Sequence, residues 1–233
     1  EGVKAITPVI RLYPTEYVTS VQLRNGEHAV IRPLRFEDHP HLVNFFGSLS
    51  KQQVELSSKE HALNYENTFF SLKRQQENAA MHTATGGTSP SGASSQQDTK
   101  PEMLHLNNSV GKQIYNELVQ MCIGDYDREL VLAVIIDERI VAIGRYTVSP
   151  LSTPNYKIAE IAVLVGESHQ KSGAGRSVLS QLINVAKKEH VKELVAHIHT
   201  TNIGMQQLTT KLGFQIQKET NSKPGFVTAT LVL

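Results

Sequence analysis

Residues 163–176 join an apolar run to a glycine-rich turn, and this arrangement suits the binding of a phosphorylated cofactor. The run Ile161–Val165 has the β-branched content of a buried strand, and a helical pattern of apolar residues starts soon after Gly175. The first amides of a helix have no partner within it and carry partial positive charge, so this position binds anions. Gly173 and Gly175 let a phosphate group approach the backbone closely.

Two common phosphate-binding motifs do not fit this turn. The dinucleotide fingerprint needs a third glycine where Val178 stands, and an acidic residue after the next strand, where the chain reads Ala196–His199. The Gly-Lys-Ser/Thr sequence of a P-loop is absent as well. A different cofactor is therefore expected.

Glu160 stands in the same apolar segment, between Ala159 and Ile161. Carboxylates rarely lie unpaired among apolar residues, and one held there is a stronger base than one in water. Glu160 is therefore a candidate general base. The alternative is a glutamate on the solvent side of a half-exposed sheet.

Three segments of the chain, in the family's own order, resemble the GNAT family of N-acetyltransferases. The glycine-rich turn, together with Val165 and Gln170, matches motif A of that family in full. The other two segments resemble motif B and the family's first strand and helix; they are Asn202–Met205 with Lys211–Phe214, and Val30–Asp38.

The resemblance narrows to the C-terminal acetyltransferase domain of bacterial protein lysine acetyltransferases that also carry an acyl-CoA-synthetase-like (NDP-forming) region. It covers roughly residues 12–65 and 115–233 and fails between them. It implies the GNAT fold, an α/β (α+β) domain with a mixed central sheet of about six to seven strands, splayed at the cofactor site and flanked by helices. The segments that carry the narrower resemblance are Leu12–Pro14, Leu23–Gly26, Ile31–Pro33, Asp125–Glu129 and Ala159–Val163.

The implied reaction is direct transfer of an acetyl group from acetyl-CoA, the co-substrate, to a lysine amine of a protein. An acyl-CoA synthetase is a candidate for that protein substrate. Glu160 matches the glutamate that is the subgroup's general base. The pantetheine arm would pair with the backbone of Val163 and Val165, and an amide near Val165 would polarise the thioester carbonyl. The implied cofactor-binding residues are Val163, Leu164, Val165, Gln170, Lys171, Ser172, Gly173, Ala174, Gly175, Arg176, Ser177, Asn202 and Met205.

Several nearby residues admit more than one interpretation. Thr209 stands where many family members have a tyrosine acid, so no general acid is identified. His197 and His199 share a strand face, but no acidic or cysteine partner is near, and we expect no metal. Asp125–Glu129 either attracts a lysine-bearing substrate or forms a solvated turn. Asn202 can cap the helix that follows it as well as contact pantetheine.

The composition excludes several classes of function. The 233 residues are 39% hydrophobic with a formal net charge of +1 and no Lys/Arg run, so we expect no nucleic-acid partner. No apolar run approaches the roughly 18 residues of a membrane span. The single cysteine, Cys122, excludes an intrachain disulfide and is typical of a cytoplasmic protein. Because the chain opens on Glu1, we expect it to be part of a longer polypeptide.

Residues 1–19 are predicted to be a linker or arm and residues 20–233 the acetyltransferase domain. We expect residues 78–102 to be a disordered low-complexity insertion, because the stretch 84–98 has no large apolar residue. Hairpins are predicted at 21–32 and 130–148, further strands at 156–165, 194–199, 214–218 and 226–233, and helices at 36–49, 175–189 and 203–212, with a short helix around 114–119.

Two other functions fit the same residues. A small-amine N-acetyltransferase would use the same fold with a closed pocket in place of an open groove. A non-catalytic domain that senses acetyl-CoA for an attached partner would need no base. Glu160 therefore favours catalysis over sensing.

Overall fold

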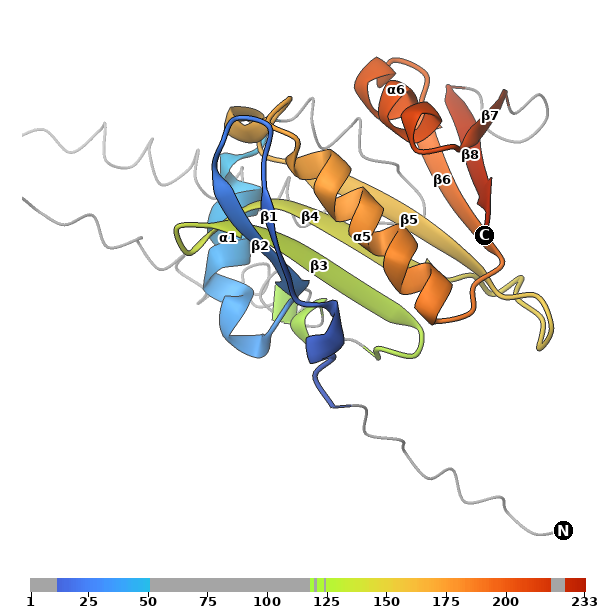
Figure 1. Ribbon diagram of the computed structural model, residues 1–233, viewed down its shortest axis with the longest axis horizontal. Coiled ribbons are helices and arrows are strands. Elements are labelled where there is room, and N and C mark those ends of the chain that lie inside the picture. Colours follow the sequence, from blue (N-terminus) through green and yellow to red (C-terminus); the bar gives the residue numbers. More distant parts are fainter. Residues whose placement is uncertain (1–11, 51–117, 120, 124, 219–224) are drawn as a thin grey trace, which may run out of the picture.

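Short segments that are apolar throughout, or that alternate between apolar and polar residues, form eight strands. These strands join one sheet in the order β1-β2-β3-β4-β5-β6-β8-β7 (Figure 1). The structure is a computed structural model that describes residues 12–50, 118–119, 121–123, 125–218 and 225–233. The strands are β1 (Thr19–Gln22), β2 (His28–Pro33), β3 (Glu129–Ile136), β4 (Arg139–Val148), β5 (Ile158–Val165), β6 (Glu193–His199), β7 (Gln215–Lys218) and β8 (Phe226–Val232).

The predicted fold class is confirmed, with a sheet slightly larger than the six to seven strands expected. The difference arises at the edges, because the short strands β1 and β7 both pair with the sheet. The described helices are α1 (His39–Ser48), α5 (Ala174–Lys188) and α6 (Ile203–Lys211), with 3₁₀ turns η1 (Thr15–Tyr17), η2 (Phe36–Asp38) and η3 (Glu167–His169). No helix within the described ranges is long and apolar enough to cross a membrane.

Helices pack on both faces of the sheet. The first turn of α5 and its stripe at Val178 and Leu182 belong to one apolar cluster, with Ala142 and Tyr146 of β4. The second cluster lies on the opposite face, because it holds strand residues of the other alternation parity. That second face, the α1 face, carries Leu34, Leu42, Phe45, Phe46, Leu49, Leu118, Met121, Cys122, Val131, Ala133, Ile140, Ile143 and Leu164.

The sheet opens between β5 and β6, the one parallel pair among the described strands. Their pairing covers only Ile158–Glu160 against Glu193–Val195. On its other edge β5 stays paired with β4 as far as Val165. The two strands therefore part after Glu160, and Figure 1 shows β6, β8 and β7 set apart from the rest of the sheet. The expected splay is present.

Within the predicted arm, Glu16 and Tyr17 contact α5 and its C-cap. Tyr17 is buried, its hydroxyl donates to Glu189, and its carbonyl accepts from Gln181 at 3.1 Å. Residues 1–11 and the predicted insertion at 78–102 lie outside the described residues.

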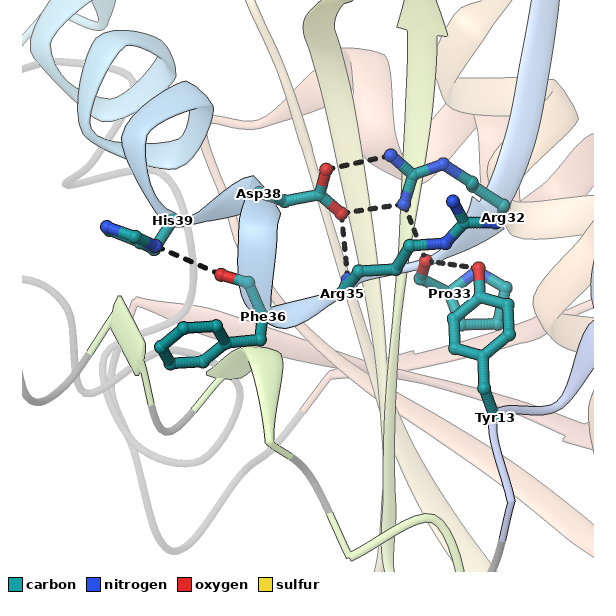
Figure 2. Close-up of polar contacts among 7 residues, drawn as sticks. All are labelled: Tyr13, Arg32, Pro33, Arg35, Phe36, Asp38 and His39. Carbon is teal, nitrogen blue, oxygen red and sulfur yellow. Dashed lines mark hydrogen bonds and ion pairs between the residues drawn. The ribbon is translucent and has the colours of Figure 1, made fainter.

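An ion pair joins the end of β2 to the start of α1 (Figure 2). The Arg32 guanidinium donates to both carboxylate oxygens of Asp38 at 2.6 and 2.7 Å, and the Arg35 amide donates to the same carboxylate at 2.7 Å. The two side chains are 16% and 8% exposed, so water screens the pair weakly. The predicted helix at 36–49 consequently starts as the 3₁₀ turn η2, with Asp38 at the N-cap of α1.

Cys122 packs within the α1-face cluster and is 4% exposed. Burial, together with the nearby carboxylates of Asp38 and Glu37, raises the pKa of its thiol to about 12. Only the thiolate reacts, so we expect a thiol reagent at about pH 8 to modify the folded chain roughly a thousandfold more slowly than a free thiol. Urea-unfolded protein is the control and should react at the ordinary rate. Equal rates in both states would contradict the buried placement.

Candidate functional site

The backbone of β5 presents its two edges to different neighbours. The Gly166 amide donates to the Val141 carbonyl at 2.8 Å, and the Ser149 amide donates to the Ile158 carbonyl at 2.9 Å. Even-numbered residues of β5 therefore direct their backbone groups to β4, because these groups alternate along a strand. The backbone groups of Ile161 and Val163 consequently point to the side of β6, where strand pairing has ended.

The glycine-rich turn ends at the N-terminus of α5 as predicted. Gly173 is the N-cap with φ of +102°, and no side chain caps the helix through it. The Ala174 amide donates to Ser172 Oγ at 3.3 Å, whereas no described residue accepts from the amides of Gly175 and Arg176. Two adjacent amides at the start of a fifteen-residue helix form an anion-binding position.

Close packing explains why the turn needs both glycines. A Cβ on Gly175 would lie 3.1 Å from Val165 Cγ2, and one on Gly173 would lie 3.2 Å from the Arg24 amide nitrogen. That amide donates to the Ser172 carbonyl at 2.8 Å, so the β1–β2 turn holds the glycine-rich turn in place. The turn therefore lies directly beside the end of β5.

Other predicted cofactor residues of the turn are more exposed. The side chains of Gln170, Lys171 and Arg176 face solvent, and Ser177 is half-buried. Lys171 has φ of +63°, an uncommon conformation for a residue with a side chain. This conformation lets the chain reverse between η3 and Gly173, so Lys171 contributes to the shape of the turn.

Glu160 lies on the α1 face of the sheet, at the last residue where β5 pairs with β6. Its side chain shares that face with Ala162 and Leu164, because side chains alternate along β5. It is half-buried, and no described residue makes a hydrogen bond or ion pair with its carboxylate. A half-buried carboxylate at the opening of the sheet can accept a proton from a group bound there.

The α1 face carries two polar residues near Glu160, Thr147 and Arg145, that were not predicted from the sequence, and also Glu129 of the acidic segment. Thr147 of β4 lies directly opposite Glu160 in the sheet register, and Glu129 of β3 lies opposite Thr147. Arg145 Nη2 donates to the Glu129 carboxylate at 2.7 Å. The available signal was an arginine and a threonine, two residues apart, within the otherwise apolar run Ile140–Val148.

The motif B residues form the start of α6. Asn202 accepts from the Met205 amide at 3.1 Å, which confirms the expected helix cap. Leu208, one turn further on, packs near Gly175 and so brings α6 beside the glycine-rich turn. Thr209 is fully buried, and its hydroxyl donates to carbonyls of its own helix. Thr209 therefore does not reach the opening between β5 and β6.

The two remaining sequence candidates have local partners. His197 contacts Thr228, and His199 contacts Thr201 at 2.7 Å. The part of the chain that the structure describes contains no group of three or more His, Cys, Asp or Glu residues that could hold a metal. Within the acidic segment 125–129, Asp125 accepts from backbone amides of its own turn, and Glu129 pairs with Arg145.

Comparisons with known proteins agree with this geometry. The family model described as acetyltransferase (GNAT) family matches residues 101–214. The crystal structure of the GNAT domain of PAT from S. lividans is 20% identical with a TM-score of 0.64, covering 95% of this chain and 100% of that one.

Two further structures contain the cofactor or a derivative of it. RimJ of Mycobacterium smegmatis, in complex with CoA-disulfide, is 11% identical with a TM-score of 0.55, covering 92% of this chain and 86% of that one. The putative acetyltransferase yncA of Salmonella typhimurium, with its cofactor acetyl-CoA, is 16% identical with a TM-score of 0.51, covering 88% and 94%. At these identities the structures establish the fold, and the family match adds the chemistry. The chain belongs to the GNAT family of N-acetyltransferases, enzymes that transfer an acetyl group from acetyl-CoA.

Proposed function

We propose that this chain transfers the acetyl group of acetyl-CoA to the side-chain amine of a lysine in a protein, with Glu160 as general base. The observation that carries the proposal is the position of Glu160. Its carboxylate lies half-buried and without a partner among the described residues, at the point where β5 and β6 separate. A carboxylate with that access can take a proton from an amine that enters between the two strands.

The cofactor would lie along the second half of β5. Its pantetheine arm pairs with the backbone of Val163, which points toward the opening, and passes Leu164 and Val165. Its pyrophosphate accepts from the amides of Gly175 and Arg176 at the start of α5. A backbone amide near Val165 stabilises the negative charge that develops on the thioester oxygen.

The lysine amine must lose a proton before it can attack the thioester, and Glu160 is the group that accepts it. A lysine amine has a pKa near 10.4, so it is almost entirely charged at neutral pH and cannot attack. Glu160 accepts one proton from the ammonium group, and the nitrogen then bonds to the thioester carbon. The carbon–sulfur bond breaks to release CoA as a thiolate, and the nitrogen gives its second proton to solvent. Because the Thr209 hydroxyl is committed to its own helix, the thiolate takes its proton from solvent.

A protein acceptor agrees with the comparisons at a general level. Proteins of the same fold include PAT and, with a TM-score of 0.55, a ribosomal L7/L12 alpha-N-protein acetyltransferase. The narrower acceptor, a lysine of an acyl-CoA synthetase, rests on the sequence resemblance to the PAT-like subgroup. The competing acceptors are a protein α-amine and a free small amine.

A panel of three acceptors tests the proposal. The chain would be incubated with acetyl-CoA and an acyl-CoA synthetase, a peptide with a free N-terminus but no lysine, or a polyamine. CoA release and tandem mass spectrometry would follow the reaction. We expect the synthetase to be acetylated on lysine with kcat/KM at least tenfold above that of the other two acceptors. Acetylation of the peptide or polyamine alone would reject the lysine assignment.

Gly175→Val is expected to weaken acetyl-CoA binding at least tenfold. The added side chain would press on Val165 and Leu208 and cover the amides that face the phosphates. Isothermal titration calorimetry with acetyl-CoA measures the effect. Asn184→Val places the same side chain on the exposed part of α5 and should bind as the wild type does. Equal affinity in both variants would place the cofactor elsewhere.

A further inference from the structure

Thr147 and Glu160 face each other across β4 and β5 on the α1 face. Directly opposed residues of an antiparallel pair have Cβ atoms about 5 Å apart, within reach of a hydroxyl and a carboxylate. Both backbones at this position belong to the continuous β4–β5 ladder, so the spacing of the two side chains is fixed by the sheet.

The hydroxyl of Thr147 lacks a partner although it is buried. Its Oγ1 atom has no hydrogen bond and almost no contact with solvent. Buried side-chain polar atoms are nearly always hydrogen-bonded, and an exception calls for an explanation. The Glu160 carboxylate opposite also has no partner among the described residues. A donor and an acceptor that both lack partners therefore face one another.

The neighbouring carboxylate does not compete for the hydroxyl. Glu129 lies on the other side of Thr147 in the register, but the Arg145 guanidinium holds its carboxylate at 2.7 Å. Of the two described carboxylates that flank Thr147 in the register, Glu160 is the one without a partner among the described residues. A change of the Thr147 side chain from one staggered rotamer to another would redirect the hydroxyl without moving the sheet.

We propose that Thr147 is a positioning residue whose hydroxyl donates to the Glu160 carboxylate and orients it toward the incoming amine. The inference rests on the proposed role of Glu160 as base. The hydrogen bond stabilises the ionised carboxylate, which is the form that accepts the proton. Other charged and titratable groups on this face are Glu129 of β3, Arg145 of β4, Glu193, His197 and His199 of β6, and Arg32 and Asp38 beside α1.

Thr147→Val removes the hydroxyl and keeps the shape, whereas Thr147→Ser keeps the hydroxyl. We expect Thr147→Val to lower kcat about tenfold with unchanged KM for acetyl-CoA, and Thr147→Ser to stay within about threefold of the wild type. The acidic limb of the kcat profile should move to higher pH in the valine variant, because the carboxylate has lost a donor.

Two further variants, Thr19→Val and Glu160→Gln, distinguish a failure of this proposal from a failure of the proposed function. Thr19→Val makes the same change in β1, at the far edge of the sheet, and should leave kcat unaltered. If Glu160→Gln abolishes turnover while Thr147→Val retains the wild-type kcat and pH profile, the positioning role fails and the base assignment stands. If Glu160→Gln retains turnover, the base assignment fails.

A readout that needs no turnover completes the test. Carbon-13 NMR of the Glu160 carboxylate, recorded at about pH 8, should show a different chemical shift in Thr147→Val from that in the wild type, because the carboxylate has lost a donor. The chemical shift in Thr19→Val should match that of the wild type. An identical chemical shift in all three proteins would overturn the proposed hydrogen bond.

Discussion

Glu160→Gln is expected to lower turnover about a thousandfold while acetyl-CoA binding stays within about twofold of the wild type. The amide keeps the size of the side chain and cannot accept the proton of a charged amine. The cofactor contacts proposed for Val163 and the start of α5 are backbone groups, which the substitution leaves in place. Initial rates with a lysine acceptor and calorimetric titration with acetyl-CoA measure the two effects separately.

Glu193→Gln is the matched control for the Glu160 variant. Glu193 lies on the same face, two residues before the position on β6 that pairs with Glu160, and its carboxylate accepts from the Tyr156 hydroxyl at 2.9 Å. Its removal should change turnover by less than about twofold. Comparable losses in both variants would show that any carboxylate on this face supports turnover electrostatically, and would reject Glu160 as the base.

Asp38→Asn is expected to lower the free energy of unfolding by about 3 kcal/mol. The substitution keeps the shape and an acceptor for the Arg35 amide, but it leaves the Arg32 guanidinium, 16% exposed, without its counter-charge (Figure 2). Urea unfolding of the two proteins measures the difference. Asp125→Asn breaks a 3.9 Å pair between exposed side chains and should change stability by less than about 0.5 kcal/mol.

The same ion pair predicts a dependence of stability on pH. Burial by itself would raise the pKa of Asp38, but the hydrogen bonds from Arg32 and the Arg35 amide outweigh it, so its pKa lies below the ordinary 3.8. A lowered pKa means that the contribution is present above pH 3.8 and is lost as pH falls through the lower, folded-state value. The stability gap between the wild type and Asp38→Asn should therefore be constant above about pH 5 and narrow below pH 3.8. A gap that does not change with pH would contradict the ionic character of the pair.

Local signals predicted the glycine-rich turn and its flanking elements well. The predicted helix at 175–189 is α5 (Ala174–Lys188). It was predictable because its apolar stripe and the glycine before it lie close together in the sequence. Strand β5 and the Asn202 cap were predicted for the same reason. Each of these features depends on contacts close in the sequence.

The neighbours of Glu160 depend on pairing between distant segments. The register of β3, β4 and β5 places Thr147 directly opposite Glu160, and Glu129 one strand further away. A shift of one residue would turn every side chain to the other face, and the sequence alone does not specify that register. The pair Arg32–Asp38 and the pairing of β7 with β8 at the other edge of the sheet are likewise consequences of tertiary packing.

The proposed reaction depends on acetyl-CoA lying between β5 and β6 with its phosphates at the start of α5. Amide chemical shifts of labelled protein, recorded while acetyl-CoA is added, test that placement residue by residue. We expect the largest changes at Val163, Gly173, Gly175 and Arg176, with small changes in β1 and β2. Large changes confined to other elements, with those four amides unmoved, would contradict the placement and the role of Glu160 that depends on it.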